Sequence, residues 1–221
     1  QANQNLISEL ELLLAKQQNQ IQTDYFFNNA QSSSLLSAAK KLYRLAKEKQ
    51  LPDAKREQGF QERDMKMFAA QLKRLERSFD VSVDKTLWLQ DLNAYMAQNQ
   101  RVAILDEALN KISDAEALSA KLDGYYALTT LTDKEQRLAW MDKDAQAFET
   151  SSDPFIRLAV ALHDTNMAQE KTEKSLKGQL STARPEYMKA IIAYYKANDW
   201  PVYPDANRTL RITYGMVHGY Q

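Results

Sequence analysis

The stretch Ser32-Ser33-Ser34-Leu35-Leu36-Ser37-Ala38-Ala39-Lys40-Lys41-Leu42-Tyr43-Arg44-Leu45-Ala46 decides the fold class of this chain. Its serines are natural helix N-caps, because a serine hydroxyl accepts a hydrogen bond from a free backbone N–H of the first turn. Apolar residues then recur three and four positions apart, which is the spacing of one face of an α-helix. The pattern predicts an amphipathic helix that begins near Ser32–Ser34 and carries Leu35, Leu36, Ala39, Leu42, Tyr43 and Ala46.

Comparable patterns predict helices along most of the chain. A first helix is expected from about Gln4 to Asp24, and a long third one from Pro52-Asp53 as far as Phe79. Ser82 or Asp84 caps a fourth, and capping-box patterns at Ser113–Glu116 and Thr132–Glu135 begin two shorter helices. Three more helices are expected. One begins at Ser152-Asp153-Pro154, the next spans about Asn166 to Leu180, and the last starts at Pro185.

The scarcity of glycine and proline supports the same fold class. The 221 residues include five of each, and none of either lies before Pro52 or between Gly59 and Gly124. Proteins average about 7% Gly and 5% Pro, and these residues punctuate strands and turns. No fixed repeat of 34 or 40 residues is present, which disfavours a regular solenoid. The sequence therefore predicts a mainly α fold, an irregular antiparallel helical domain over residues 1–199.

The last residues, 200–221, follow a different pattern. Leu210, Ile212 and Tyr214 alternate with polar residues, the period of two that is typical of a β-strand. A single strand needs a sheet to pair its backbone, so we expect a turn and a first strand whose remaining sheet lies elsewhere. With a first residue that is Gln1, the chain is expected to be a segment of a larger protein.

Composition excludes several functional classes. Lys+Arg and Asp+Glu both number 29, so the formal net charge is zero and no overall field attracts nucleic acid. No apolar run approaches eighteen residues, which predicts no membrane span. The absence of cysteine excludes disulfides, thiolate metal sites and a cysteine nucleophile.

Residues that could carry chemistry are few. Only His163 and His218 could act as a catalytic imidazole, and neither has a glycine-rich serine motif nearby. The carboxylates Asp142, Asp144 and Glu149 are more simply a solvated helix face than a metal site, and no phosphate-binding or dinucleotide-binding motif occurs. We therefore predict no catalytic, cofactor-binding or metal-ligating residue and no cofactor, although an enzyme centred on His163 stays an alternative.

Other candidate features also have a structural interpretation. Lys40, Lys41, Arg44, Lys47 and Lys49 form a basic stretch, which is followed by acidic residues and favours a helix flank with local charge pairs over a nucleic-acid patch. The pairs Tyr125-Tyr126 and Tyr194-Tyr195 are expected in core packing rather than stacked on a ligand. Asn207-Arg208-Thr209 fits the glycosylation pattern, which matters only in a eukaryotic secretory pathway.

Several stretches, in this order, resemble one family. They are Ser34 to Leu45, Pro52-Asp53-Ala54-Lys55-Arg56-Glu57, Gly59-Phe60-Gln61-Glu62-Arg63-Asp64, Asp153-Pro154-Phe155-Ile156, Arg184-Pro185-x-Tyr187-Met188, and Tyr203-Pro204-Asp205-Ala206-Asn207-x-Thr209-Leu210-Arg211-x-Thr213-Tyr214-Gly215. Over nearly the whole chain this set is similar to bacterial dipeptidyl-peptidases 7 and 11 and dipeptidyl aminopeptidase BII, serine peptidase family 46. The tyrosine-proline-aspartate tail and the Gly59–Asp64 block are specific in combination.

The resemblance implies a chymotrypsin-like double β-barrel with a large inserted helical domain that covers the cleft. The parent would be an exported dimeric serine peptidase, periplasmic or on the cell surface, that removes dipeptides from peptide N-termini. Its histidine and aspartate would precede this segment and its serine would follow it, so no catalytic residue is transferred to this chain. We expect this segment to be a helical cap domain, inactive alone, that ends in the first strand of the second barrel half. The alternative is a stand-alone helical module that binds a protein partner.

Overall fold

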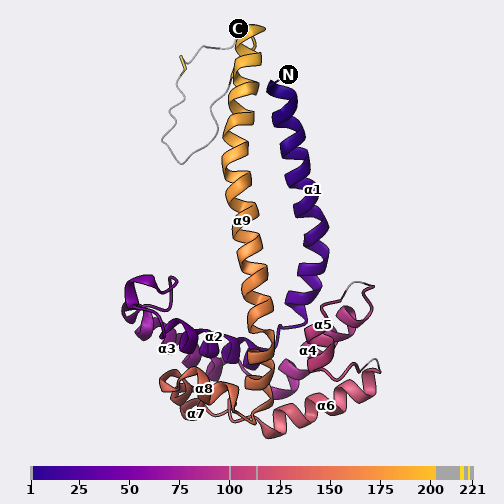
Figure 1. The fold of residues 1–221 in the computed structure, drawn as a ribbon, viewed down its shortest axis with the longest axis vertical. Coiled ribbons are helices and arrows are strands. Elements are labelled where there is room, and N and C mark those ends of the chain that lie inside the picture. The colour runs from indigo at the N-terminus through magenta and orange to yellow at the C-terminus, as the bar shows by residue number, and fades with distance from the viewer. Residues whose placement is uncertain (1, 100, 113, 203–214, 217–218, 220–221) are drawn as a thin grey trace. The chain divides into compact units, whose positions relative to one another are not determined.

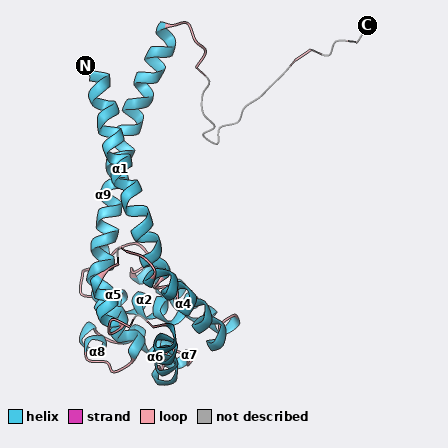
Figure 2. Cartoon of the chain, turned by 90° about the vertical axis from the view of Figure 1, so that its right-hand side faces the viewer, coloured by secondary structure: helices cyan, strands magenta, loops and turns pink. Residues whose placement is uncertain are grey.

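The computed structural model describes residues 2–99, 101–112, 114–202, 215–216 and 219. This part of the chain is mainly α-helical, as the sequence predicts, and contains no strand (Figures 1 and 2). Its α-helices are α1 (Ala2–Asn29), α2 (Ser34–Glu48), α3 (Met65–Arg74), α4 (Val81–Met96), α5 (Ala103–Ala108), α6 (Ala115–Leu128), α7 (Lys134–Ala139), α8 (Ala145–Glu149) and α9 (Pro154–Ala197). Short 3-10 turns lie at Asp53–Lys55, Glu62–Asp64, Leu75–Arg77 and Trp140–Asp142. The predicted strand at 210–214 lies outside the described residues.

The chain divides into two compact units. The larger one, residues 14–176, holds a hydrophobic core in which α4 packs against α6, α3 against α7 and α2 against α8. Its fully buried side chains come from helices far apart in sequence: Leu35, Leu36 and Leu42 of α2, Trp88 and Leu92 of α4, Leu118 and Leu122 of α6, and Phe155, Ile156 and Leu162 of α9. Each of these helices contributes one apolar face, and that face is buried only when the other helices pack against it.

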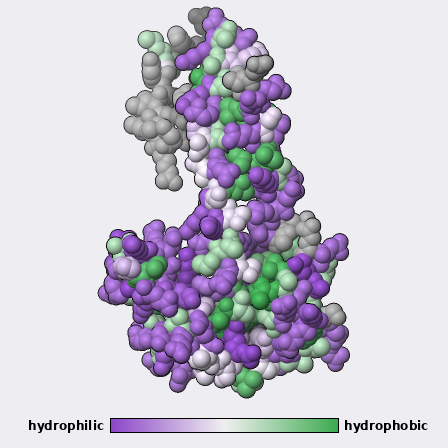
Figure 3. All heavy atoms as spheres, viewed as in Figure 1, coloured by the Kyte–Doolittle hydropathy of each residue, from purple (hydrophilic) through white to green (hydrophobic). Residues whose placement is uncertain are grey.

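The smaller unit comprises residues 1–13 and 177–221. Within it the start of α1 and the end of α9 run side by side in opposite directions (Figures 1 and 2). Leu10 and Leu13 of α1 and Leu180 and Ala183 of α9 are buried. Charged and polar residues cover most of the face of the molecule seen in Figure 3, with smaller apolar patches between them.

The start of α2 is held by a polar cluster. Ser33 is its N-cap, with its hydroxyl accepting from the backbone N–H of Leu36 at 3.4 Å, which confirms the predicted cap. The Asp84 carboxylate of α4 accepts from the Ser33 hydroxyl at 2.9 Å, from the backbone N–H of Ser34 at 2.9 Å, and from the hydroxyl of Tyr126 in α6. This negative charge lies at the positive end of α2, where the helix dipole favours it.

The third helix, which the sequence predicts from Pro52-Asp53 to Phe79, begins later and ends earlier than predicted. Between Asp53 and Asp64 the chain forms two 3-10 turns and a loop, and α3 begins only at Met65. Gly59 has a φ of 94°, a left-handed conformation that interrupts a right-handed helix. The Asp64 carboxylate then accepts from the backbone N–H groups of Gly59 and Gln61, at 2.9 and 3.3 Å, and fixes the loop.

The three helices predicted after residue 152 are one helix. α9 continues through residues 165 and 185, with Pro185 inside it. Pro185 removes one hydrogen bond, to the carbonyl of Ser181, but both residues are exposed, so water can satisfy that carbonyl. The burial of Leu180 and Ala183 one turn earlier favours continued helix despite the proline.

Other boundaries differ by a few residues. α1 extends five residues beyond Asp24, so Tyr25 lies inside the helix. α4 is capped by Asp80 rather than by Ser82 or Asp84. α6 and α7 are capped by Asp114 and Asp133, one residue after the predicted serine and threonine. Aspartate is as good an N-cap as serine or threonine. Where the two stand side by side, the sequence does not decide which of them precedes the helix.

Candidate functional site

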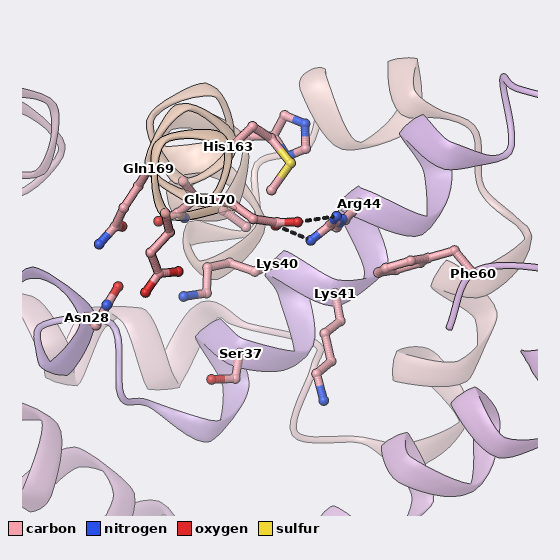
Figure 4. Close-up of a pocket in the computed structure, with 13 residues that line it drawn as sticks. Asn28, Ser37, Lys40, Lys41, Arg44, Phe60, His163, Gln169 and Glu170 are labelled. Atoms are coloured by element: carbon pink, nitrogen blue, oxygen red, sulfur yellow. Dashed lines mark hydrogen bonds and ion pairs between the residues drawn. The ribbon is translucent and has the colours of Figure 1, made fainter. Parts of the chain in front are cut away.

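The larger unit contains a polar cavity of about 490 Å³ (Figure 4). Two helix faces form most of its wall, one from α2 and one from α9, and the end of α1 and the loop at Phe60 complete it. Its lining residues are Asn28, Ser37, Lys40, Lys41, Arg44, Phe60, Ala159, His163, Asn166, Met167, Gln169, Glu170 and Glu173.

Helical periodicity places the polar side chains of α2 in this cavity. Ser37, Lys40, Lys41 and Arg44 are three, four and seven positions apart and therefore share one face of the helix. The opposite face holds the buried leucines of the core. The basic stretch seen in the sequence thus supplies three cations to one wall.

Arg44 joins α2 to α9. Its guanidinium donates two hydrogen bonds to the Glu170 carboxylate, at 2.6 and 3.1 Å, and lies 5.0 Å from the ring centre of Phe60. These hydrogen bonds lower the pKa of Glu170 below its usual value, and Lys174 adds a contact at 2.7 Å. A two-point contact of this kind fixes geometry as well as charge.

Lys40 has a different environment. Its Nζ donates to Oε1 of Gln31 at 2.9 Å, and burial lowers the pKa of Lys40 to about 8. Oε1 of Gln31 also accepts from Nδ2 of Asn166 at 2.9 Å, and Nε2 of Gln31 donates to the carbonyl of Phe27 at 3.2 Å. Gln31 is 2% exposed, so a buried amide positions the ammonium group.

His163 lines the same cavity from the middle of α9, not from the end of a helix as predicted. Its ring lies 4.9 Å from that of Tyr43 in an edge-on arrangement, and burial lowers the pKa of His163. Ser37 also lines the cavity, yet in the described part of the chain no hydrogen bond connects it to His163. The described geometry therefore lacks the nucleophile and base contact that a catalytic serine requires.

The three carboxylates that the sequence assigns to a solvated helix face are exposed, although they lie on a 3-10 turn, a helix cap and a helix end rather than on one face. Asp144 caps α8 by accepting from the backbone N–H of Ala147 at 2.9 Å, and Glu149 accepts from the Tyr43 hydroxyl at 2.8 Å. Asp142 lies in the 3-10 turn before α8. Among the residues that the structure describes, no three carboxylates, histidines or cysteines are arranged to hold a metal ion.

The remaining candidates take structural positions or lie outside the description. Tyr125 and Tyr126 pack on Phe155, with ring centres 5.8 and 5.1 Å apart, which agrees with the expected core role. Tyr194 and Tyr195 are instead exposed, and their ring centres lie 5.7 and 5.4 Å from that of Trp200. The prediction of core packing was therefore wrong for these two tyrosines. His218 and Asn207-Arg208-Thr209 lie outside the described residues.

The basic stretch forms a local charge pair, between Arg44 and Glu48 at 3.7 Å, and its other charge pairs in the described part of the chain are long-range. Arg44 pairs with Glu170, Lys47 contacts Glu149 at 3.6 Å, and Lys49 donates to the carbonyl of Met141 at 2.7 Å. The acidic residues that follow in sequence pair elsewhere: Asp53 and Glu62 with Arg56, and Glu57 with Lys174. Phe60 lines the cavity, and Tyr43 lies in the core.

Two features of the structure have no signal in the sequence. Gln31 and Glu170 hold the cavity's cations in position, but they are 9 and 126 residues from Lys40 and Arg44. Arg137 is 1% exposed and donates to the carbonyls of Leu72 and Leu131 and to Glu76. Its position in a short polar helix predicts an exposed side chain.

No helix in the described ranges is long and apolar enough to cross a membrane. The fold is thus a helical domain with a polar cavity and no complete catalytic site among its described residues. Over its full length, residues 1–221, the sequence matches the model of the peptidase S46 family, and the chain belongs to that family. This confirms the family to which the sequence motifs point.

Curated relatives share that membership. The chain is 69% identical over 219 residues, 99% of its length, to an Asp/Glu-specific dipeptidyl-peptidase of Shewanella putrefaciens. It is 29% identical over 202 and 206 residues, 90% of its length in each case, to proteins of the same name from Capnocytophaga gingivalis and Flavobacterium psychrophilum. It spans only 30% of the first of these and 27% of the other two.

Proposed function

We propose that this chain is the helical cap domain of an exported serine dipeptidyl-peptidase with Asp and Glu specificity. The observation that carries the proposal is the 69% identity to a peptidase of that name across nearly all of this chain, together with its helical fold. Residues 1–199 would form the cap, and residues 200–221 would lead into a barrel half that carries the serine. The parent would act in the periplasm or at the cell surface as a homodimer, on peptide substrates.

The physical role of such a cap is to restrict access. A helical unit with a well-packed core moves as a body, so it can exclude water and limit which substrate ends reach a nucleophile. The core of residues 14–176 gives the stiffness that this role requires. No catalytic residue of the parent is assigned to this chain.

The test compares the 221-residue chain with the full-length peptidase that contains it. Both are incubated with chromogenic dipeptides that carry Asp or Glu, and circular dichroism verifies that the short chain is folded. We expect cleavage by the full-length protein, blocked by a serine-reactive inhibitor, and none by the short chain. Inhibitor-sensitive cleavage by the short chain alone would contradict the proposal.

An exposed apolar row on α1 favours the second candidate function, a module that binds a protein partner. Leu14 and Ile21 lie seven residues apart on one face of the helix and are 46% and 59% exposed. Exposed apolar rows of this kind are typical of contact surfaces. This candidate requires the isolated chain to capture a partner other than the rest of its own peptidase, which a pull-down with the isolated chain as bait would detect.

A further inference from the structure

The ammonium group of Lys40 has no carboxylate partner in the described part of the chain. Its hydrogen bond to Oε1 of Gln31 uses one of its three N–H donors. Burial alone accounts for its lowered pKa, with no neighbouring acidic group that compensates. Two donors of a half-buried cation therefore remain available toward the cavity.

The position of this cation is fixed in advance. Gln31 is buried, and its side chain is held at both ends, by Asn166 and by the carbonyl of Phe27. A fixed donor loses little conformational freedom when a ligand binds, which increases affinity. Asn28 and Ser37 lie on the same side of the cavity as Lys40 in Figure 4 and carry further polar groups.

Among the cations at the cavity, Lys40 is the one that is half-buried and has no carboxylate partner in the described part of the chain. Arg44 and Lys174 both bind the carboxylate of Glu170, so Arg44 is already paired with an acidic group. Lys41 is exposed and donates to Gln71 at 3.3 Å. Glu173, also at the cavity, is exposed and lies near Asp24, whose pKa is raised mainly by burial.

We propose that Lys40 binds a carboxylate group of an acidic peptide in this cavity, with Asn28 and Ser37 beside it. A volume of about 490 Å³ lies within the usual range for small-ligand sites, about 300–1,000 Å³. The choice of an acidic peptide rests on the proposed function, because the relatives are named for Asp and Glu. The ammonium would donate its two remaining N–H groups to the carboxylate.

Binding should depend on pH through Lys40. A group with a pKa of about 8 is mostly charged at pH 7 and mostly neutral at pH 9, so affinity should fall about tenfold over that interval. The other charged groups around it are Arg44 and Lys41 on α2, Glu170 and Glu173 on α9, and Asp24 on α1. His163, with its lowered pKa, stays neutral.

The experiment is isothermal titration of the full 221-residue chain at pH 7 with four dipeptides. Ala-Asp carries two carboxylates, Ala-Asp amide only the side-chain one, Ala-Asn only the C-terminal one, and Ala-Asn amide none. Binding of either single-carboxylate peptide supports the proposal and identifies which carboxylate Lys40 holds. Binding of Ala-Asn amide as tightly as Ala-Asp would overturn it, as would no binding of any of the four.

Variants connect the binding to Lys40. Lys40→Met retains the aliphatic stem and should weaken Ala-Asp binding about tenfold or more, the range for a lost charged hydrogen bond. The matched control Lys66→Met replaces an exposed lysine of α3 that does not line the cavity, so it should change affinity less than about twofold. Equal binding by folded Lys40→Met and the parent chain contradicts the proposal.

Lys40→Arg provides a second, independent test that does not depend on the stability of Lys40→Met. Arginine stays charged up to pH 12, so this variant should bind at pH 7 and lose the pH dependence between 7 and 9. A pH profile like that of the parent chain would mean that another group titrates. Because binding is measured without catalysis, an inactive full-length peptidase would contradict the proposed function while leaving this test unaffected.

Discussion

At the residue scale, Arg137 shows how a single buried cation can stabilise a helical domain. Its guanidinium donates to the carbonyl of Leu72 at 3.2 Å, at the end of α3, and to that of Leu131 at 2.6 Å, before α7. Leu72 and Leu131 are themselves buried, so Arg137 places its donors inside the core. The side chain therefore joins α3 and α7 through their backbones.

We expect Arg137→Met to lower the free energy of unfolding by roughly 2 to 4 kcal/mol, because it removes the hydrogen bonds that a buried charged group donates to Leu72, Leu131 and Glu76. Urea unfolding followed by circular dichroism measures the loss. Arg77→Met is the matched control: Arg77 is exposed, and its replacement should change stability by less than about 0.5 kcal/mol. Equal losses in the two variants would show that the buried contacts of Arg137 carry no net stability.

The pair between Arg44 and Glu170 predicts a pH dependence. The folded-state pKa of Glu170 is lowered, mainly by the Arg44 hydrogen bonds, so its contribution is complete above about pH 4.5 and is lost as pH falls through the folded-state pKa. Glu170→Gln should therefore cost about 1 kcal/mol at pH 7. The difference between variant and parent should disappear near pH 2 to 3 in thermal unfolding. A constant difference across this range would assign the effect to packing instead.

At the scale of elements, two glycines should respond to substitution in opposite ways. Gly178 lies inside α9 and an added Cβ has open space, so Gly178→Ala should raise stability by about 0.5 to 1 kcal/mol. Gly59 also has open space but a φ of 94°, so Gly59→Ala should lower stability by about 1 kcal/mol or more. Thermal unfolding of both variants checks the signs. Stabilisation by Gly59→Ala would mean that the loop adopts another conformation.

How far the sequence predicts the elements depends on whether their determinants are local. The N-cap of α2 was predictable, because Ser33 bonds to the N–H of Leu36 three residues away. The break near Gly59 was missed, since a glycine reveals a left-handed residue only when neighbours such as Asp64 fix the loop. Pro185 predicts the start of a new helix, but α9 continues through it, because the burial of Leu180 and Ala183 outweighs the proline's unfavourable effect inside a helix.

The candidate cavity was less predictable than the fold. The row Ser37, Lys40, Arg44 on α2 follows from helical periodicity, and the sequence identifies it as a basic stretch. Its chemistry depends on Gln31 and Glu170, which approach Lys40 and Arg44 only through tertiary packing. Polar residues on α9 have the same appearance in sequence as any solvated helix face.

At the scale of the whole molecule, burial is unequally distributed between the units. The core of residues 14–176 holds nearly all of the large buried side chains, whereas Tyr187, Met188 and Tyr194 in the end of α9 are 38%, 50% and 57% exposed. Amides open locally where few apolar contacts resist. Amide hydrogen exchange should therefore be faster at residues 187–197 than in α2. Equal protection of the two segments would show that α9 opens only with the whole chain.

The arrangement of the core has a consequence for synthesis on the ribosome. α2 buries Leu36 and Leu42 against a cluster that also requires Trp88, Leu122 and Phe155, and its N-cap is anchored by Asp84 and Tyr126. Translation adds about 5–20 residues per second, so roughly 6 to 25 s separate the emergence of α2 from that of the start of α9. During that interval the apolar face of α2 lacks the part of its cover that α9 supplies. A nascent chain of this design therefore exposes apolar surface until its last core helix has emerged.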